Sequence, residues 1–382
     1  MTATTEITDH ISVDDHLIEP PDVWLSRLPK KFLDEAPRVE RVSKDHDAWV
    51  FQGNVEPLAP TGSRRADGRI AIENTFEEMR PGCYDPVARL ADMDADRVVA
   101  AVCFPSMSGF SGTKFSTCDD KELGLACIRV YNDFVLDEWS PSAPGRYIPM
   151  VLIPLWDAKL AVEEITRSID RGARAISFSE DPYRQGFPSI HDQSGFWDPI
   201  FAVAEEAGLP LCMHMGGSSD IISHREDRPW FTKHAMCYMN SQLALADWLT
   251  SDHFIKFPDL KICISEGGIG WIPHVLQHLD GMYELYPEWA GAPQRERPST
   301  YFRSNVYGCF IEDVVGTRLL DLLGVDNVMA ETDYPHGDSR WPHSHERLLE
   351  QIDHLPLDAQ AKIARGNAEK VFHFTPSAIG ER

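Results

Sequence analysis

The 382-residue sequence lacks the patterns that would place it in a membrane or outside the cell. No apolar run approaches the ~20 residues that a membrane-spanning helix needs. The first residues, MTATTEITDH, lack the basic and apolar stretches of a secretory signal. The eight cysteines are scattered without a CxxC pair, and several lie in apolar runs where a reduced thiol is a small hydrophobic side chain. We therefore expect a cytoplasmic protein with no membrane partner.

Positive charge is also scarce in this chain. Lys and Arg total 36 against 60 Asp and Glu, which gives a net charge of −24. Such an acidic chain repels phosphate backbones, so we expect no nucleic-acid partner. Two catalytic motifs are missing as well, the GxSxG nucleophile elbow and the GxxxxGK(S/T) phosphate loop. The chemistry must therefore come from other residues.

What the sequence does contain is a regular alternation of short apolar runs and amphipathic segments. Apolar runs of this kind are typical of strands buried on both faces. The predicted strands are the run that begins at Ile11 and then 98–106, 146–155, 173–180, 209–217, 260–268, 304–311 and 326–336. The predicted helices are 119–139, 157–172, 196–208, 241–254, 271–286, 313–323, 345–354 and 358–372.

This alternation predicts an α/β fold, a (β/α)8 TIM barrel with a long insertion after strand 1. The alternative is a doubly wound open sheet, which requires a glycine fingerprint after the first strand, where this chain has DDHLIEPP. We expect residues 1–382 to form a single barrel domain. Residues 20–92, which are rich in Pro and Gly, are predicted to be an insertion that serves as a lid or a subunit contact. Barrels with such insertions often pair, so we expect a homodimer.

Side chains that bind metals follow the predicted strands. In a barrel the functional residues lie at the carboxyl ends of the strands, and five of these ends carry a carboxylate or an imidazole. They are Asp14, His16 and Glu19 at strand 1, Glu180 at strand 4, His214 at strand 5, Glu266 at strand 6, and Asp333 with His336 at strand 8. Asp14 and His16 are two apart on one strand and share a face, whereas Asp15 points away and is expected to be a surface or capping carboxylate.

Each of these residues also has a structural explanation when taken singly. His214 alone reads as a core histidine, Glu266 as the cap of the following helix, and Asp333 as a turn residue before a proline. Taken together, these explanations require charged groups at many strand ends without a shared purpose. Because isolated buried charges are costly, a metal site is the better interpretation.

The motifs at these positions also resemble a known family. VDDHLIEP at strand 1, CMHMGG at strand 5, SEGGIGWIP at strand 6, ETDYPH at strand 8 and the closing GNAEKVF are similar to the amidohydrolase superfamily in its amidohydrolase-2 branch. That branch includes enzymes that resemble aminocarboxymuconate-semialdehyde decarboxylase. The resemblance implies that Asp14, His16, His214 and Asp333 hold a divalent metal. This chain departs from the pattern at strand 6, where Glu266 stands in place of the histidine of the decarboxylases.

Three functions follow from this pattern. The first is a metal-dependent hydrolase or carboxy-lyase with one ion such as zinc, in which Asp333, Glu266 and His336 are the catalytic candidates. The second is a dinuclear non-haem iron or manganese oxygenase, in which Glu19, Glu180 and Glu266 are also ligands. The third is an inactive binding barrel.

Aromatic residues in the loops indicate the substrate. We expect Phe110, Trp230, His234 and Trp341 to surround the mouth of the barrel and to bind a small, apolar or aromatic organic acid or amide.

Overall fold

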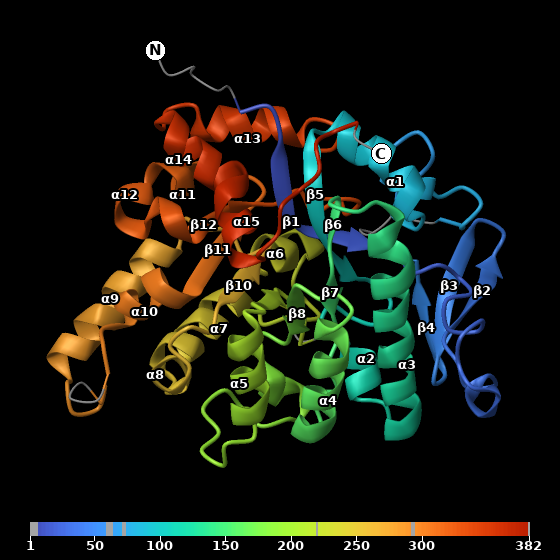
Figure 1. The fold of residues 1–382 in the computed structure, drawn as a ribbon, viewed down its shortest axis with the longest axis horizontal. Helices are drawn as coiled ribbons and strands as arrows, with labels where there is room; N and C mark the ends of the chain where they lie inside the picture. The colour runs from blue at the N-terminus through green and yellow to red at the C-terminus, as the bar shows by residue number, and fades with distance from the viewer. Residues whose placement is uncertain (1–6, 59–63, 71–73, 219–220, 292–294, 381–382) are drawn as a thin grey trace.

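The computed structural model describes residues 7–58, 64–70, 74–218, 221–291 and 295–380. It shows a mixed α/β fold in which parallel strands form the interior and helices lie around them (Figure 1). The parallel strands are β1 (His10–Leu17), β5 (Val98–Pro105), β6 (Tyr147–Ile148), β7 (Met150–Val151), β8 (Ala175–Phe178), β9 (Leu211–His214), β10 (Ile262–Ser265), β11 (Val306–Phe310) and β12 (Val328–Ala330).

Neighbouring strands in space follow the order of the chain. One sheet has the order β1-β5-β6, and the other has the order β12-β11-β10-β9-β8-β7. β6 and β7 are one predicted strand that Pro149 interrupts, since proline has no N–H to donate. After β12, the Asp333 N–H donates to the Asp14 carbonyl and the His16 N–H donates to the Tyr334 carbonyl, both at 2.7 Å. These bonds place the segment after the last strand beside the first strand.

The strands form where the sequence predicts them because both of their faces are buried, and most of the strands are apolar. Every residue of β1 and of β5 is buried. β9, β10 and β11 are also buried throughout, between the surrounding helices and the interior.

The helices are α1 (Pro86–Ala95), α2 (Thr113–Ser116), α3 (Lys121–Phe134), α4 (Ala158–Ile169), α5 (Asp198–Ala207), α6 (Trp230–Ala235), α7 (Met239–Thr250), α8 (His253–Lys256), α9 (Ile272–Leu285), α10 (Pro298–Asn305), α11 (Val314–Arg318), α12 (Leu320–Leu323), α13 (Ser344–Ile352), α14 (Leu357–Ala361) and α15 (Asn367–Val371). Their ends have local causes. The Asp157 carboxylate caps α4 by accepting from the N–H groups of Lys159 and Leu160. α5 ends at Gly208, whose φ of 65° suits a residue without a Cβ. Within the described part of the chain, no helix combines the length and the apolar character needed to cross a membrane.

The segment between β1 and β5 contains a small antiparallel sheet. Its strands are β2 (Arg38–Ser43), β3 (His46–Phe51) and β4 (Asn54–Pro57), in the order β2-β3-β4. This sheet lies beside α3, outside the parallel strands (Figure 1). It falls inside the predicted insertion 20–92.

Candidate metal centre

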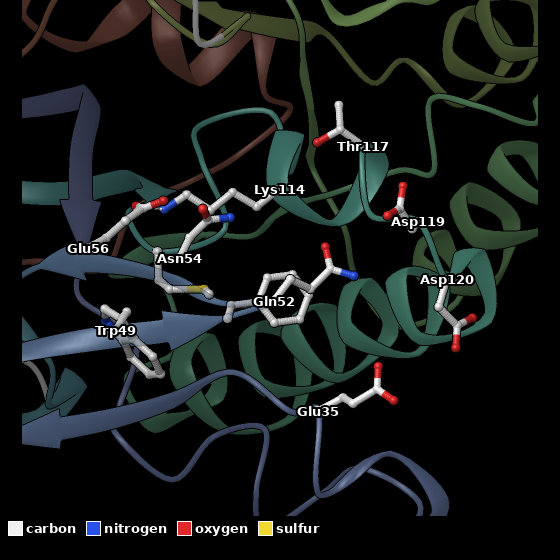
Figure 2. Close-up of a pocket in the computed structure, with 11 residues that line it drawn as sticks. Glu35, Trp49, Gln52, Asn54, Glu56, Lys114, Thr117, Asp119 and Asp120 are labelled. Carbon is white, nitrogen blue, oxygen red and sulfur yellow. Dashed lines mark hydrogen bonds and ion pairs between the residues drawn. The ribbon is translucent and has the colours of Figure 1, made fainter.

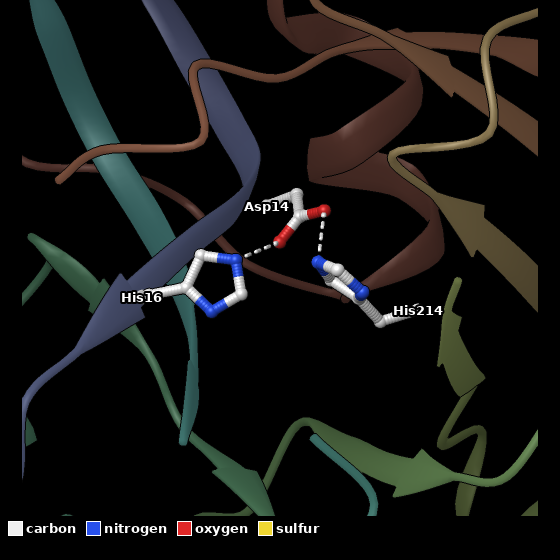
Figure 3. A group of neighbouring side chains, drawn as sticks. All are labelled: Asp14, His16 and His214. Carbon is white, nitrogen blue, oxygen red and sulfur yellow. Dashed lines mark ion pairs between the residues drawn. The ribbon is translucent and has the colours of Figure 1, made fainter. Parts of the chain in front are cut away.

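Two residues of β1 and one of β9 point toward one another at the carboxyl ends of the strands. Asp14 Oδ1 lies 3.5 Å from His16 Nε2, and Asp14 Oδ2 lies 3.6 Å from His214 Nε2 (Figure 3). All three side chains are buried. The alternation of side chains along β1 puts Asp14 and His16 on the same face, as the sequence predicted.

Three further predicted residues join this group. Asp333 Oδ1 lies 3.1 Å from His16 Nε2 and 3.1 Å from His336 Nδ1. Glu266 Oε2 lies 2.9 Å from His214 Nε2. The ligand atoms form three overlapping groups, Asp14–His16–His214, His16–Asp333–His336 and His214–Glu266–Asp333, each within 4.8 Å. Residues from β1, from β9 and from the segments that follow β10 and β12 therefore converge on one point.

The donor atoms of this cluster suit a divalent cation. Apart from the ion-pair contacts given above, both carboxylate oxygens of Asp14 and of Asp333, both ring nitrogens of His16, and His214 Nε2 are buried without a hydrogen-bond partner among the described residues. Buried polar atoms normally have hydrogen-bond partners, so several such atoms without one at a single point fit the binding of a cation. The His214 Nδ1 atom contacts the Met215 carbonyl at 2.6 Å, which leaves Nε2 for a metal.

The pKa shifts of the cluster residues also fit the binding of a cation. Burial raises the pKa of Asp14, and the nearby Glu331, Asp333 and Glu266 carboxyl groups raise it further. Burial and Glu266 raise the pKa of Asp333 in the same way. Burial lowers the pKa of His336 to about 4, so its ring stays neutral at pH 7. A cation among these groups favours ionised carboxylates and neutral imidazoles, which are the forms that bind metals.

Two ligand-bearing positions have an unusual backbone. Glu266 and Asp333 have φ values of 53° and 56°, in the left-handed region that non-glycine residues seldom adopt. The N–H of Glu266 donates to both oxygens of Glu331 at 3.2 Å. The Asp333 N–H donates to Asp14, as described above. The strained conformations are thus held by partners within the cluster.

Asp15 differs from its prediction as a surface or capping carboxylate. It does point away from Asp14 and His16, but only 1% of it is exposed, and its Oδ2 lies 2.9 Å from the guanidinium of Arg89. Arg89 also donates to the His16 carbonyl at 2.6 Å and to the Tyr334 carbonyl at 2.9 Å. The buried Asp15–Arg89 pair therefore ties the end of β1 to the segment after β12.

Glu19 is not placed in the cluster, although it was predicted as a metal ligand. Its carboxylate is buried and accepts hydrogen bonds from the N–H groups of Met107 at 2.8 Å and Ser108 at 3.3 Å. Burial raises its pKa, and these backbone hydrogen bonds lower it. Glu19 therefore holds the loop after β5 and lies outside the three groups of ligand atoms, and its role as a metal ligand stays a prediction.

Glu180, also predicted as a metal ligand, has similar surroundings. Its carboxylate accepts from the Ser218 N–H at 2.6 Å, from the Ser218 hydroxyl at 2.8 Å and from Asn240 at 3.2 Å. It fixes the loop after β9 and lies outside the three groups of ligand atoms.

The four predicted substrate residues have different surroundings. The Phe110 ring lies 3.9 Å from that of His214 and 5.0 Å from that of His16, so it covers the cluster. Trp230 and His234 are stacked on α6 at 4.8 Å, and 64% of Trp230 is exposed. Trp341 packs under Arg80 and its indole N–H donates to the Asp92 carbonyl, so it serves the packing of α1.

A cavity of about 610 Å³ lies beside the loop that follows β5, between the antiparallel sheet and the segment that holds α2 and α3 (Figure 2). Trp49, Phe51 and Met107 give it an apolar floor, and Lys114 and Glu56 form an ion pair at its rim. Met107 is also the residue whose N–H Glu19 accepts. The insertion thus borders the loop that carries Phe110 to the cluster.

Sequence reasoning missed several residues that support the site. Arg64 donates to the carbonyls of His336 and Ser339, both at 3.1 Å, and is buried, although the stretch around it reads as a basic loop. Glu331 stands in the ETDYPH motif, but only its contact with the Glu266 N–H reveals its role. Asp338 and Arg89 give no signal in the sequence because their partners are distant along the chain.

Comparison with known proteins agrees with this geometry. The family model described as Amidohydrolase matches residues 21–374. The 2-amino-3-carboxymuconate-6-semialdehyde decarboxylase of Dictyostelium discoideum is 22% identical over 306 residues, which are 79% of this chain and 80% of that protein.

Two solved structures show the same fold. An amidohydrolase from Mycobacterium avium subsp. paratuberculosis K-10 has a TM-score of 0.76 at 22% identity, with 96% of this chain and 100% of that chain covered. A dihydroxybenzoic acid decarboxylase from Polaromonas sp. JS666, with bound manganese and the inhibitor 2-nitroresorcinol, has a TM-score of 0.63 at 16% identity, with 98% and 100% covered.

The match to the family model and the similarity to metal-dependent decarboxylases, together with the cluster, define a metal-dependent enzyme of the hydrolase and carboxy-lyase class. The chain belongs to the amidohydrolase family, as the sequence motifs predicted.

Proposed function

We propose that this enzyme is a metal-dependent carboxy-lyase that removes the carboxyl group of a small aromatic acid. The observation that carries the proposal is the set of unpartnered, buried donor atoms on Asp14, His16, His214 and Asp333. The named decarboxylases among the similar proteins support the choice of a carboxy-lyase over a hydrolase.

The scaffold for this chemistry is a closed (β/α)8 barrel formed by residues 1–382 as one domain. The chain-order sequence of parallel strands and the hydrogen bonds from the segment after β12 to β1 support this closure. The lid or subunit role of the insertion 20–92, the homodimer and the cytoplasmic location stay predictions.

One divalent ion would be held by Asp14, His16, His214 and Asp333. Such an ion polarises a substrate oxygen, or lowers the pKa of its water toward ~7. Carboxylate-rich ligation with two imidazoles suits manganese as well as zinc. The dinuclear oxygenase is not favoured, because Glu19 and Glu180 are bonded to backbone N–H groups and to neighbouring side chains.

The residues around the ion would transfer a proton, hold the metal ligands in place and pack against the substrate. Loss of CO₂ from an aromatic carboxylate leaves its electron pair on the ring, and the ring carbon must then take up one proton. Glu266, 2.9 Å from His214, is positioned to move that proton, at the position where the family resemblance implies a histidine. His336 contacts Asp333 and stacks on the His16 ring at 3.6 Å, which keeps both ligands in place. Phe110 lies where an aromatic ring would pack.

The test is turnover of a panel of hydroxylated benzoic acids by the manganese- or zinc-loaded enzyme. We expect release of one CO₂ for each decarboxylated phenol, no dependence on O₂, and loss of turnover in His214→Asn. The matched control is His191→Asn, since His191 is a histidine paired with aspartate on the surface. Hydrolysis of aryl amides without CO₂ release, or a requirement for O₂, would show that the proposed reaction is wrong.

A further inference from the structure

The Gly217 carbonyl, three residues after His214, accepts hydrogen bonds from side chains of two other loops. The hydroxyl groups of Ser111 and Thr113 donate to it at 2.8 Å and 2.6 Å. The side-chain amide of Gln185 donates to the same carbonyl at 3.0 Å and to the Thr113 hydroxyl at 2.7 Å. Ser111 and Thr113 follow β5, whereas Gln185 follows β8. The segments after β5, β8 and β9 therefore meet at one backbone oxygen.

Tight packing fixes the position of this oxygen. The Gly217 N–H donates to the His214 carbonyl at 3.0 Å. A Cβ atom at Gly217 would lie 3.0 Å from that carbonyl oxygen and 2.9 Å from a carboxylate oxygen of Glu180, so the space suits glycine. Glu180 also accepts from the N–H of the next residue, Ser218, at 2.6 Å. The hydroxyl groups and the amide thus bind to a point that is tied to the predicted ligand His214.

The same contacts hold the backbone around Phe110, which lies in the loop 106–112. The Phe110 carbonyl accepts from the Ser177 hydroxyl, and the next residue, Ser111, is bonded to Gly217. The Phe110 ring centre lies 3.9 Å from that of His214. Because the backbone is bonded on both sides of the Phe110 side chain, the ring is held over the candidate metal centre before any substrate binds.

A second glutamine in the chain provides a comparison. Gln193 Nε2 donates to a backbone carbonyl, that of His191, at the same distance of 3.0 Å. This contact is exposed and lies within the loop before α5. The two glutamines therefore make the same kind of bond, but only the Gln185 bond joins a segment to the site.

We propose that Gln185 is a positioning residue, which holds the loop 106–112 on Gly217 and thereby keeps the Phe110 ring over the predicted metal ligands. It acts through Thr113 and Gly217 and does not have to touch the substrate. A fixed ring would form one wall of the site for an aromatic acid, so Gln185 would affect how tightly the substrate binds more than the rate of the chemical step. This part of the inference rests on the proposed function.

The first experiment compares Gln185→Met with the matched control Gln193→Met. Methionine has a similar length and cannot donate a hydrogen bond. For a hydroxylated benzoic acid that the enzyme decarboxylates, we expect Gln185→Met to raise KM about 3- to 10-fold, the effect of one neutral hydrogen bond, and to change kcat less than twofold. In a Phe110→Ala background the same substitution should change KM by less than about twofold, because the ring through which it acts is gone. Equal KM values in the two single variants, or a rise in KM that persists without Phe110, would overturn the proposal.

The second experiment does not depend on turnover and is made before metal is added. The N–H groups of Gly109 and Gly112 donate to the carbonyls of Ser106 and Gly109, at 3.3 Å and 2.8 Å, inside the loop 106–112. Hydrogen exchange at these two amides should rise about 3- to 10-fold in Gln185→Met, because the loop opens more easily. Thr113→Val, which removes the hydroxyl that Gln185 contacts, should have the same effect, and Gln193→Met should have none.

Exchange at the wild-type rate in both Gln185→Met and Thr113→Val would refute the role of Gln185. Absence of decarboxylation by the metal-loaded wild-type enzyme would instead disprove the proposed function. The exchange data would still decide whether Gln185 holds the loop.

Discussion

Replacing Arg89 by methionine tests whether a buried guanidinium holds together the strand ends around the metal centre. Arg89 is fully buried and bonds to Asp15, to the His16 carbonyl and to the Tyr334 carbonyl. Methionine has a similar length and fills most of the space, so the change removes charge and hydrogen bonds with little loss of packing.

The expected loss of stability follows from the buried Asp15 carboxylate that the substitution leaves without its cation. Asp15 keeps the hydroxyl of Ser12 at 2.7 Å, but its charge loses its partner while it is only 1% exposed. Removal of one partner from a buried ion pair costs about 3–5 kcal/mol. Since the stability of a folded domain is about 5–15 kcal/mol, Arg89→Met should remove a large part of it.

Equilibrium unfolding in urea measures this loss, and Asp15→Asn provides the complementary variant. The double variant should be less destabilised than the sum of the two single variants, because no buried charge is left unpaired. Arg146→Met is a matched control. Arg146 is also a buried arginine that bonds to two backbone carbonyls, those of Val98 and Val99, and to an aspartate. Both arginine variants should lose stability, but only Arg89→Met should weaken Mn²⁺ binding. A loss below about 1 kcal/mol, or equal Mn²⁺ affinity in the two variants, would refute the reasoning.

Three other predictions concern single residues. The pKa of His10 is lowered to about 3 by burial and by His345. The folded chain therefore binds fewer protons than the unfolded chain below about pH 6.5. Stability should fall as the pH drops from 6.5 toward 3, and calorimetry should show a flatter pH dependence for His10→Asn; an unchanged slope would contradict this. Glu19→Gln should leave the number of ions per chain unchanged, as measured by elemental mass spectrometry, and loss of an ion would show that it is a ligand. Phe110→Ala should raise KM for an aromatic acid by about 2- to 10-fold with a smaller change in kcat, since an aromatic pair contributes about 0.5–1.5 kcal/mol; equal KM values would exclude the contact.

The sequence predicted the strands well because burial on both faces imposes an apolar run that can be read directly. The helix predicted over 157–172 also begins where expected, because its Asp157 cap is a local interaction. Six predicted residues, Asp14, His16, His214, Glu266, Asp333 and His336, meet in one cluster because strands of a parallel sheet bring their ends to the same edge.

The surroundings of Glu19 and Glu180 could not be predicted from the sequence. A carboxylate that follows a strand looks the same in sequence whether it binds a metal or accepts from a backbone N–H. Which of the two roles the carboxylate has depends on the loops that pack over it. These loops follow other strands, β5 for Glu19 and β9 for Glu180. The Asp15–Arg89 and His234–Asp338 contacts were missed because their partners are 74 and 104 residues apart. Pairs at such separation require knowledge of the tertiary fold.

We propose above that Asp14, His16, His214 and Asp333 hold one divalent ion. The most direct measurement is the metal content of the purified chain, determined by elemental mass spectrometry beside the variants Asp333→Asn and His214→Asn. We expect about one zinc or manganese ion per chain, retained on dialysis in the wild type and lost in both variants. Two ions per chain, or full retention of the ion in both variants, would contradict it.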